Sequence, residues 1–259
     1  MSEFRIATWN TQGNAWAEGK LASLVNSCSP DVICLQECGN LFSTFRGDFQ
    51  RVRSSLYYKI HSFGSRAPYY HVYYYSWRNS SRCSMATLIN SQHNVVKASL
   101  IYSGYSNYYA DQSWLPKNIY DFFSEEGFDA PSYDKTGRRG LRGMLQTIVD
   151  LKGYDGEYLS INNVHLPSGR PNFAIDIAKS FFRKSRHFHS DTILIGDMNI
   201  PVNMWNQQRV PYRLFSSDTA THSKGQVLDY LFTNLDAPVS IETGRELQGS
   251  DHFYVLYKF

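Results

Sequence analysis

Short apolar runs bounded by polar or turn-forming residues dominate the hydrophobic pattern of the chain, and runs of this length favour strands. Some runs are apolar throughout, as expected for strands buried on both faces. The stretch "PYYHVYYYSW" alternates instead, which would bury one set of tyrosines and expose the other. The predicted strands are residues 4–10, 31–37, 71–77, 84–91, 144–151, 157–166, 192–199, 227–234 and 253–259.

Two segments have helical periodicity. Residues 17–26 carry apolar side chains at i, i+3 and i+4 before Pro30, and residues 171–187 place phenylalanines and an isoleucine on one helical face. Strands outnumber helices, and no internal repeat or low-complexity linker divides the chain. We therefore predict a single α/β domain over residues 1–259, with a Tyr-rich insertion or long loop at about 103–140.

Composition narrows the class of protein without identifying a function. Hydrophobic residues make up 42% of the chain and charged residues 19%, which is typical of a globular rather than a disordered protein. No run approaches the roughly 18 apolar residues of a membrane span, and the first ten residues lack the apolar core of a signal peptide. The chain is therefore either intracellular, or exported with a leader removed and Met1 in its place. A net charge of +3 is compatible with a polyanionic partner but does not indicate one.

The four cysteines are Cys28, Cys34, Cys38 and Cys83. An even number leaves a disulfide open in an exported protein, but no second Cys/His pair follows at zinc-site spacing. Because unpaired cysteines are commonly core residues, buried free thiols are the favoured interpretation.

Polar residues with catalytic chemistry stand at the ends of six predicted strands. They are Asn10, Glu37, Asn163 with His165, Asp197 with Asn199, Asp229, and Asp251 with His252. A single residue of this kind is more often a turn, a cap or a structural histidine. Six strand ends are difficult to explain as six independent turns. If its strand continues, Asp197 points to the same side as Asn199, and such a pair can orient a water and hold an oxyanion.

The motifs "TWNTQG", "LQE", "NVHL", "GDMN", "LDYLF" and "SDHFYV" follow one another in this order over nearly the whole chain. Together they resemble the motif series of the endonuclease/exonuclease/phosphatase superfamily. The resemblance implies a deoxyribonuclease I-like fold, a four-layer α/β sandwich of two packed mixed β-sheets flanked by helices. Within this superfamily, "WNTQG", "VYYYSW" followed by "MATLINS", and "RGMLQTIV" are most similar to the catalytic B subunit of cytolethal distending toxins.

The chain departs from the family pattern at three positions. Leu166 stands where a small residue is usual, and Tyr254 stands where proline is usual. His71 occupies the region where related nucleases have an acidic residue that pairs with the first histidine. The partner of His165 is therefore left open by the sequence.

The resemblance implies how the site binds metal and substrate. Glu37 and Asp251 would supply the hard oxygen ligands that Mg²⁺ prefers, with Asn10 adding a carboxamide, and Mn²⁺ or Ca²⁺ are supporting alternatives. Arg142 would hold a phosphate through its guanidinium group, although a solvated charge at a strand start is an equal alternative.

The resemblance also implies the catalytic roles. His165 and His252 would flank the scissile phosphate, and Asp229 would orient one of these two histidines. Asp197 and Asn199 would orient the attacking water and bind the pentacovalent intermediate. Which histidine acts as the base is not determined by the sequence.

The leading functional hypothesis is a secreted, Mg²⁺-dependent phosphodiesterase that nicks host DNA in the nucleus, carried by the delivery subunits of a toxin complex. The alternative is a phosphoinositide phosphatase that uses the same site, since sister families hydrolyse phosphomonoesters. A third hypothesis, from another class, is a catalytically inactive binding subunit. This hypothesis is disfavoured because all of the principal motif residues are present.

Overall fold

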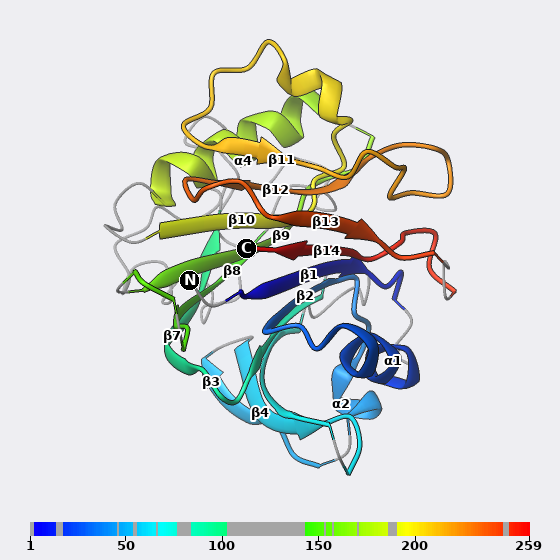
Figure 1. Ribbon diagram of the computed structural model, residues 1–259, viewed down its shortest axis with the longest axis vertical. Helices are drawn as coiled ribbons and strands as arrows, with labels where there is room; N and C mark the ends of the chain where they lie inside the picture. The colour runs from blue at the N-terminus through cyan, green and yellow to red at the C-terminus, as the bar shows by residue number, and fades with distance from the viewer. Residues whose placement is uncertain are drawn as a thin grey trace, which may run out of the picture.

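The computed structural model contains two β-sheets that pack face to face, with helices on their outer faces (Figure 1). The structure describes residues 3–13, 18–45, 47–53, 56–65, 67–76, 84–102, 143–152, 154–156, 158–169, 171–185, 191–245 and 249–259. The predicted Tyr-rich insertion, Arg142 and Cys83 lie outside the described residues. The prediction of a single domain stays a prediction.

The larger sheet has eight strands. They are β1 (Arg5–Asn10), β2 (Val32–Gln36), β3 (Gln50–Arg53), β4 (Leu56–Ser62), β5 (Tyr69–Tyr75), β6 (Met85–Asn90), β13 (Ser240–Thr243) and β14 (Val255–Lys258). Their order across the sheet is β13-β14-β1-β2-β6-β5-β4-β3.

The smaller sheet has six strands. They are β7 (Asn94–Tyr102), β8 (Gly143–Asp150), β9 (Leu159–His165), β10 (Asp191–Asp197), β11 (Arg213–Phe215) and β12 (Asp229–Thr233). Their order is β11-β12-β10-β9-β8-β7.

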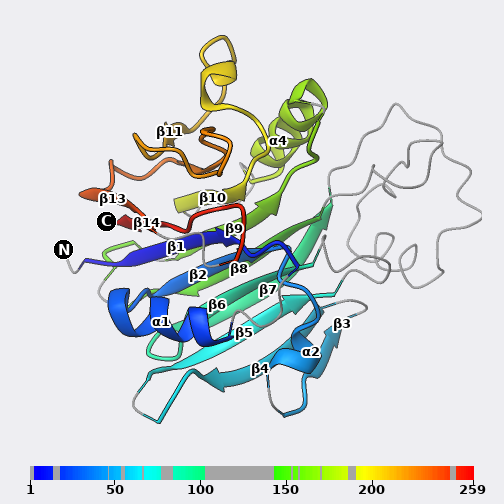
Figure 2. The same cartoon turned by 90° about the vertical axis from the view of Figure 1, so that its right-hand side faces the viewer.

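The described helices are α1 (Glu18–Cys28), α2 (Leu41–Thr44), α4 (Pro171–Ser185) and the 3₁₀ helix η4 (Val202–Trp205). Figure 1 and Figure 2 show α1 and α2 on the outer side of the larger sheet and α4 on the outer side of the smaller one. Within the described part of the chain, no helix has both the length and the apolar character needed to cross a membrane.

Three apolar clusters hold the layers together. Leu21 and Leu24 of α1 pack against the larger sheet, and Phe181 of α4 packs against the smaller one. Ile6 and Ile195 belong to a third cluster that lies between the two sheets. Burial of apolar surface at all three interfaces drives the packing of such layers. The predicted four-layer sandwich of two mixed sheets is confirmed.

Each sheet contains a parallel pair of strands connected through a helix. β1 and β2 are parallel and joined by α1, and β9 and β10 are parallel and joined by α4. An antiparallel strand flanks each pair, β14 beside β1 and β12 beside β10. Within each sheet, the carboxyl ends of the parallel strands and the amino end of the antiparallel strand therefore lie at one edge.

The alternation predicted for the tyrosine-rich stretch is present in β5. Tyr70 and Tyr74 are buried beneath α1 and α2, whereas Tyr69 is 59% exposed. The buried hydroxyls are hydrogen-bonded to backbone carbonyls, that of Tyr70 to Pro30 and that of Tyr74 to Gly39. Pairing these hydroxyls removes the cost of burying them.

Three of the cysteines are described, and all three are free thiols. Cys34 and Cys38 are buried, and burial raises the pKa of the Cys38 thiol to about 12. These two cysteines are therefore unreactive core residues, as the sequence favoured.

The described strands β3, β4, β7, β11 and β13 were not predicted, and β4 and β7 have identifiable reasons. In β4 two of the inward positions are taken by Lys59 and His61, and the imidazole of His61 stacks on Phe45 with 4.3 Å between ring centroids. In β7 a bulge between Val95 and Lys97 shifts the alternation by one residue. Polar inward residues and a bulge both remove the period-two signal.

A buried polar contact joins the two sheets beneath their shared edge. The amide nitrogen of Gln36 donates to Asn163 Oδ1 at 2.7 Å. Asn163 Nδ2 donates in turn to the carbonyl oxygens of Leu35 (3.1 Å) and Ala86 (2.9 Å). Asn163 lies in the smaller sheet and its three partners lie in the larger one. This residue therefore fixes how one sheet is placed against the other.

Replacing Asn163 by alanine leaves buried polar groups of the larger sheet without a partner. We expect Asn163→Ala to lower the free energy of unfolding by about 3 kcal/mol. Urea unfolding followed by tryptophan fluorescence measures this change. The matched control is Asn94→Ala, which truncates an exposed asparagine at the start of β7 and should change stability by less than about 0.5 kcal/mol. Equal losses in the two variants would contradict the role assigned to Asn163.

Candidate active site

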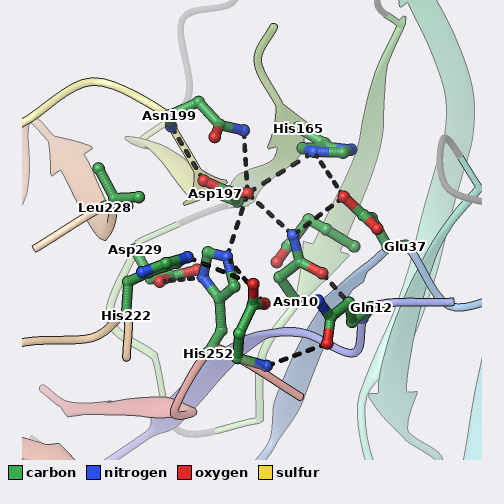
Figure 3. Close-up of polar contacts among 12 residues, drawn as sticks. Asn10, Gln12, Glu37, His165, Asp197, Asn199, His222, Leu228, Asp229 and His252 are labelled. Carbon is green, nitrogen blue, oxygen red and sulfur yellow. Dashed lines mark hydrogen bonds and ion pairs between the residues drawn. The ribbon is translucent and has the colours of Figure 1, made fainter. Parts of the chain in front are cut away.

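The polar strand ends identified in the sequence lie together at one edge of the two sheets (Figure 3). Asp197, the last residue of β10, is directly paired with His165 at the end of β9 and with Asp229 at the start of β12. Asn10 ends β1 in the facing sheet. The strand register therefore brings residues that are far apart in the sequence into one cluster.

The carboxylate of Asp197 is the centre of this cluster. Its Oδ2 accepts hydrogen bonds from Asn10 Nδ2 (2.9 Å) and Asn199 Nδ2 (3.0 Å). The same oxygen lies 3.6 Å from His165 Nε2 and 3.9 Å from His252 Nε2. Asp197 is 1% exposed, and this burial raises the pKa of its carboxyl to about 7, against the opposing effect of His252. A carboxyl with this pKa can both accept and release a proton near neutral pH.

Asn199 reaches Asp197 by a different route from the one predicted. The strand ends at Asp197, and Asn199 adopts a left-handed backbone conformation with φ of 51°. Its backbone N–H therefore turns back and donates to Asp197 Oδ1 at 2.9 Å, and its side-chain amide also donates to Leu166 O at 2.8 Å. The two side chains meet as predicted, but through a tight turn rather than through a continued strand.

Gly196 allows the close approach of the two strands that carry His165 and Asp197. Its φ is 146°, and a Cβ at this position would lie 2.0 Å from the carbonyl oxygen of Val164 in β9. Any side chain would force β9 and β10 apart. The glycine in "GDMN" is therefore required by the site geometry.

His252 pairs with Asp229, which settles the choice that the sequence left open. The distance from His252 Nδ1 to Asp229 Oδ2 is 2.8 Å, and both side chains are buried. Burial lowers the pKa of His252, but the facing carboxylates of Asp229, Asp197 and Asp251 outweigh it and raise the pKa to about 10. His252 is therefore an imidazolium at neutral pH, with Nδ1–H donated to Asp229 and Nε2–H directed into the site.

His165 lies beside Glu37 rather than beside Asp229. His165 Nε2 is 3.4 Å from Glu37 Oε1, and Glu37 follows β2 with a left-handed backbone conformation (φ 46°). His71 is directed elsewhere, since its Nδ1 is hydrogen-bonded to the hydroxyl of Tyr58 at 2.9 Å. His71, which stands where related nucleases have an acidic residue, is therefore not hydrogen-bonded to His165 through Nδ1. The contacts of His165 inside the cluster are with Glu37 and Asp197.

Asn10 is hydrogen-bonded through both polar atoms of its side-chain amide. Its Oδ1 accepts the backbone N–H of Gln12 at 2.9 Å, and its Nδ2 faces both Asp197 (2.9 Å) and Glu37 Oε1 (3.5 Å). The amide orientation is fixed because only an oxygen can accept from Gln12. Asn10 is therefore a hydrogen-bond donor that joins two carboxylates, and the metal-ligand role predicted for it stays a prediction.

Sequence reasoning missed several residues that hold this cluster in place. Thr221 Oγ1 accepts the backbone N–H groups of Leu228 and Asp229, at 2.9 and 3.0 Å. Ser250 Oγ donates to the backbone carbonyl of Asn10 at 2.6 Å. Such residues carry no motif, because hydroxyls that bond to backbone groups are common in every loop.

His222 was also missed, although it lies beside the predicted residues. Its Nε2 is 3.4 Å from Asp251 Oδ2, and its ring packs edge-on against His252 with centroids 4.7 Å apart. Burial and the neighbouring charge of His252 lower the pKa of His222, which is therefore a neutral imidazole. The predicted phosphate contact Arg142 lies outside the described residues and is not placed relative to this cluster.

The protein has two packed β-sheets, and carboxylates, imidazoles and carboxamides lie together at one edge that the sheets share. This fold and this site are those of a class of phosphate-ester hydrolases. Residues 7–252 match the model of the Endonuclease/Exonuclease/phosphatase family. The chain therefore belongs to this family, whose members hydrolyse phosphate esters and generally use divalent metal ions.

Solved structures of low sequence identity share the fold. The cytolethal distending toxin of Actinobacillus actinomycetemcomitans is 16% identical with a TM-score of 0.66, over 98% of this chain and 97% of that chain. The toxin of Haemophilus ducreyi is 17% identical with a TM-score of 0.64, over the same shares of the two chains. Truncated TDP2 of Caenorhabditis elegans is 14% identical with a TM-score of 0.59, over 99% of this chain and 97% of that chain. A search of curated proteins finds no match to the sequence.

Two groups of side chains in the described part of the chain have ligand atoms close enough together to hold a metal ion: His222 with Asp251 and His252, and Asp197 with Asp229 and His252. Glu37 and Asp251 are the carboxylates of the cluster that reach solvent. Their side chains are 18% and 36% exposed, whereas Asp197 and Asp229 are enclosed and already hydrogen-bonded. Because Mg²⁺ retains several waters and uses one or two carboxylates, a partly exposed carboxylate suits it better than an enclosed one.

The Asp229–His252 pair predicts a measurable titration in the metal-free protein. We expect Asp229→Asn to lower the pKa of His252 from about 10 by about 2 pH units, because it removes the carboxylate that stabilises the imidazolium. NMR titration of the imidazole in protein stripped of metal measures this pKa.

The folded-state pKa lies above the ordinary value of 6.5, so the pair contributes stability that is fully present below pH 6.5 and is lost as pH rises through about 10. Asp155→Asn, in an exposed turn, is the matched control and should leave the pKa of His252 unchanged. An unchanged pKa in Asp229→Asn would show that the pair is not the cause of the shift.

Proposed function

We propose that this protein is a Mg²⁺-dependent phosphodiesterase that nicks DNA. The observation that carries the proposal is the buried carboxylate of Asp197, whose Oδ2 lies within 4 Å of the imidazole nitrogens of both His165 and His252. A proton acceptor flanked by two imidazoles suits the attack of water on a phosphate between them. Family membership supports phosphate-ester hydrolysis in general, and the choice of DNA is our inference.

Each group has a task in this reaction. Asp197 takes the proton of the attacking water as the water oxygen bonds to phosphorus, and Asn199 holds Asp197 in the required orientation. The bond from phosphorus to the leaving sugar oxygen breaks, and that oxygen takes up a proton from solvent. The imidazolium of His252 and the imidazole of His165 donate hydrogen bonds to the phosphate oxygens, where negative charge increases in the transition state.

A divalent cation held by Glu37 and Asp251 would neutralise charge on the phosphate. The choice between Mg²⁺ and other divalent ions rests on the oxygen ligands of this pair, which suit hard cations. Asn10 assists by donating to both Asp197 and Glu37, so that the proton acceptor and the cation ligand keep a fixed separation.

We further propose that the protein acts as a toxin subunit that is exported, travels with delivery subunits and reaches DNA in a target cell. The support is the motif resemblance and the structural similarity to two cytolethal distending toxins. At 16% and 17% identity the structural similarity supports the fold alone. The proposals of export and delivery rest on the resemblance of the sequence motifs.

We expect the purified protein to relax supercoiled plasmid in the presence of Mg²⁺, and EDTA to stop the reaction. Asp197→Asn should lower the nicking rate about 1,000-fold, because it removes the proton acceptor while keeping the hydrogen-bonding shape. His165→Ala should cause a loss of similar order. Agarose-gel separation of relaxed from supercoiled plasmid measures the rate, and Asn94→Ala serves as the active control.

Plasmid that remains supercoiled with Mg²⁺, Mn²⁺ and Ca²⁺ would contradict the nuclease proposal. A parallel assay of phosphate release from phosphoinositides then separates the remaining hypotheses. Release that depends on Asp197 would favour the phosphatase, and inactivity on both substrates would favour the binding subunit.

A further inference from the structure

His222 lies in the loop between β11 and β12, outside every motif that carries the family resemblance. Its backbone pairs with that of His252 in an isolated antiparallel bridge. The adjacent backbone extends this contact, since Ser223 N donates to Asp251 O at 2.8 Å and Phe253 N donates to Thr221 O at 2.8 Å. The loop is therefore docked against the segment that carries Asp251 and His252.

The proton position on His222 follows from its hydrogen bonds. The backbone N–H of Lys224 donates to His222 Nδ1 at 3.0 Å, so Nδ1 is the acceptor nitrogen of the ring. In a neutral imidazole the proton is then on Nε2. Nε2 faces Asp251 Oδ2 at 3.4 Å, and Figure 3 shows His222 beside the Asp229–His252 pair. His222 therefore directs an N–H group at the carboxylate of Asp251.

The same hydrogen bond argues against His222 as a direct metal ligand. Coordination through Nε2 would require the proton to move to Nδ1. Nδ1–H would then oppose the N–H of Lys224 at the 3.0 Å now occupied by a hydrogen bond. The loop geometry thus favours a hydrogen-bond donor at this position over a ligand.

The backbone of Asp251 is fixed by hydrogen bonds, whereas its carboxylate makes only longer contacts with two imidazoles. Its backbone N–H donates to Gln12 Oε1 at 3.2 Å, and its carbonyl accepts from Ser223. Its side chain is 36% exposed, with Oδ1 3.7 Å from His252 Nε2 and Oδ2 3.4 Å from His222 Nε2. Each imidazole therefore contacts a different oxygen of the carboxylate, and a rotation of the carboxylate would break both contacts.

We propose that His222 is a positioning residue that orients the carboxylate of Asp251 for a divalent cation. The inference rests on the proposed function, because it takes Asp251 as a cation ligand. A donor that fixes a ligating carboxylate restricts its rotation before the cation binds, and loss of such a contact commonly weakens metal affinity 10- to 100-fold. His222 thereby couples the β11–β12 loop to cation binding.

Two amide substitutions separate the contact of His222 with Asp251 from the hydrogen bond that His222 accepts from Lys224 N. His222→Asn retains an acceptor for the Lys224 N–H but is too short to reach Asp251. His222→Gln extends its amide N–H₂ to the position of Nε2 and restores the donor. Gln226→Ala, which truncates an exposed side chain in the same loop, is the matched control.

The experiment measures Mn²⁺ binding to protein stripped of metal and free of substrate, by the loss of the EPR signal of free Mn²⁺. We expect His222→Asn to raise the dissociation constant for Mn²⁺ about 10- to 100-fold. His222→Gln should lie within about 3-fold of the unsubstituted protein, and Gln226→Ala should match it. Plasmid nicking by His222→Asn at saturating Mg²⁺ should recover to within about 3-fold, because the effect is on cation affinity.

The outcomes distinguish this inference from the proposed function. If the unsubstituted protein binds Mn²⁺ and nicks plasmid while His222→Asn binds Mn²⁺ equally well, only the positioning role is overturned. Equal weakening in His222→Asn and His222→Gln, with thermal unfolding unchanged, also overturns it, because the donor then has no effect. If the unsubstituted protein binds no Mn²⁺ and leaves plasmid intact, the proposed function and this inference are both overturned.

Discussion

Burial of the Asp197 carboxylate at the junction of the two sheets is the constraint on which the rest of the site depends. A carboxylate that is 1% exposed must be hydrogen-bonded, because an unpaired buried charge is strongly destabilising. Asn199, two residues along the chain, donates two hydrogen bonds to Asp197, from its backbone N–H and its side-chain amide. Asn10 of the opposite sheet donates a third. The hydrogen bond from Asn10 to Asp197 therefore depends on how the two sheets are placed, as do the contacts of Asn163 one layer below. The assembly of the site therefore depends on the packing of the two sheets.

In three histidines of the protein, the partner hydrogen-bonded to Nδ1 determines what Nε2 contacts. In His93 and His222 a backbone N–H occupies Nδ1, so Nε2–H is directed at an aspartate, Asp31 in the first case at 2.7 Å. In both residues Nε2 is therefore the nitrogen that contacts the carboxylate. In His252 the aspartate occupies Nδ1 instead, and Nε2 is left to face the site. A histidine and an aspartate thus form a structural contact in His93–Asp31, and in His252–Asp229 they give a charged hydrogen-bond donor within the site.

The sequence predicted most of the sandwich and the cluster at its edge, because buried strands and polar strand ends leave strong local signals. It did not predict β4, where Lys59 and His61 occupy inward positions, since a polar residue in the core is satisfied by tertiary contacts that no local pattern encodes. The pairing of Asp229 with His252 and the donor role of Asn10 depend on strand register and on the N–H of Gln12. Such contacts join residues far apart in the sequence, such as Asn10 and Asp197, which are 187 positions apart, and they are visible only after folding.

The four carboxylates of the site differ in exposure, and this difference assigns them to two kinds of chemistry. Asp197 and Asp229 are enclosed, and each lies beside an imidazole with which a proton could be exchanged under the proposed function. Glu37 and Asp251 are partly exposed, and a hydrated cation can reach them while keeping its waters. Each exposed carboxylate is adjacent to an imidazole, Glu37 to His165 and Asp251 to His222. Under the proposed function, cation binding and proton transfer are therefore separated by depth in one cluster, and the imidazoles lie between them.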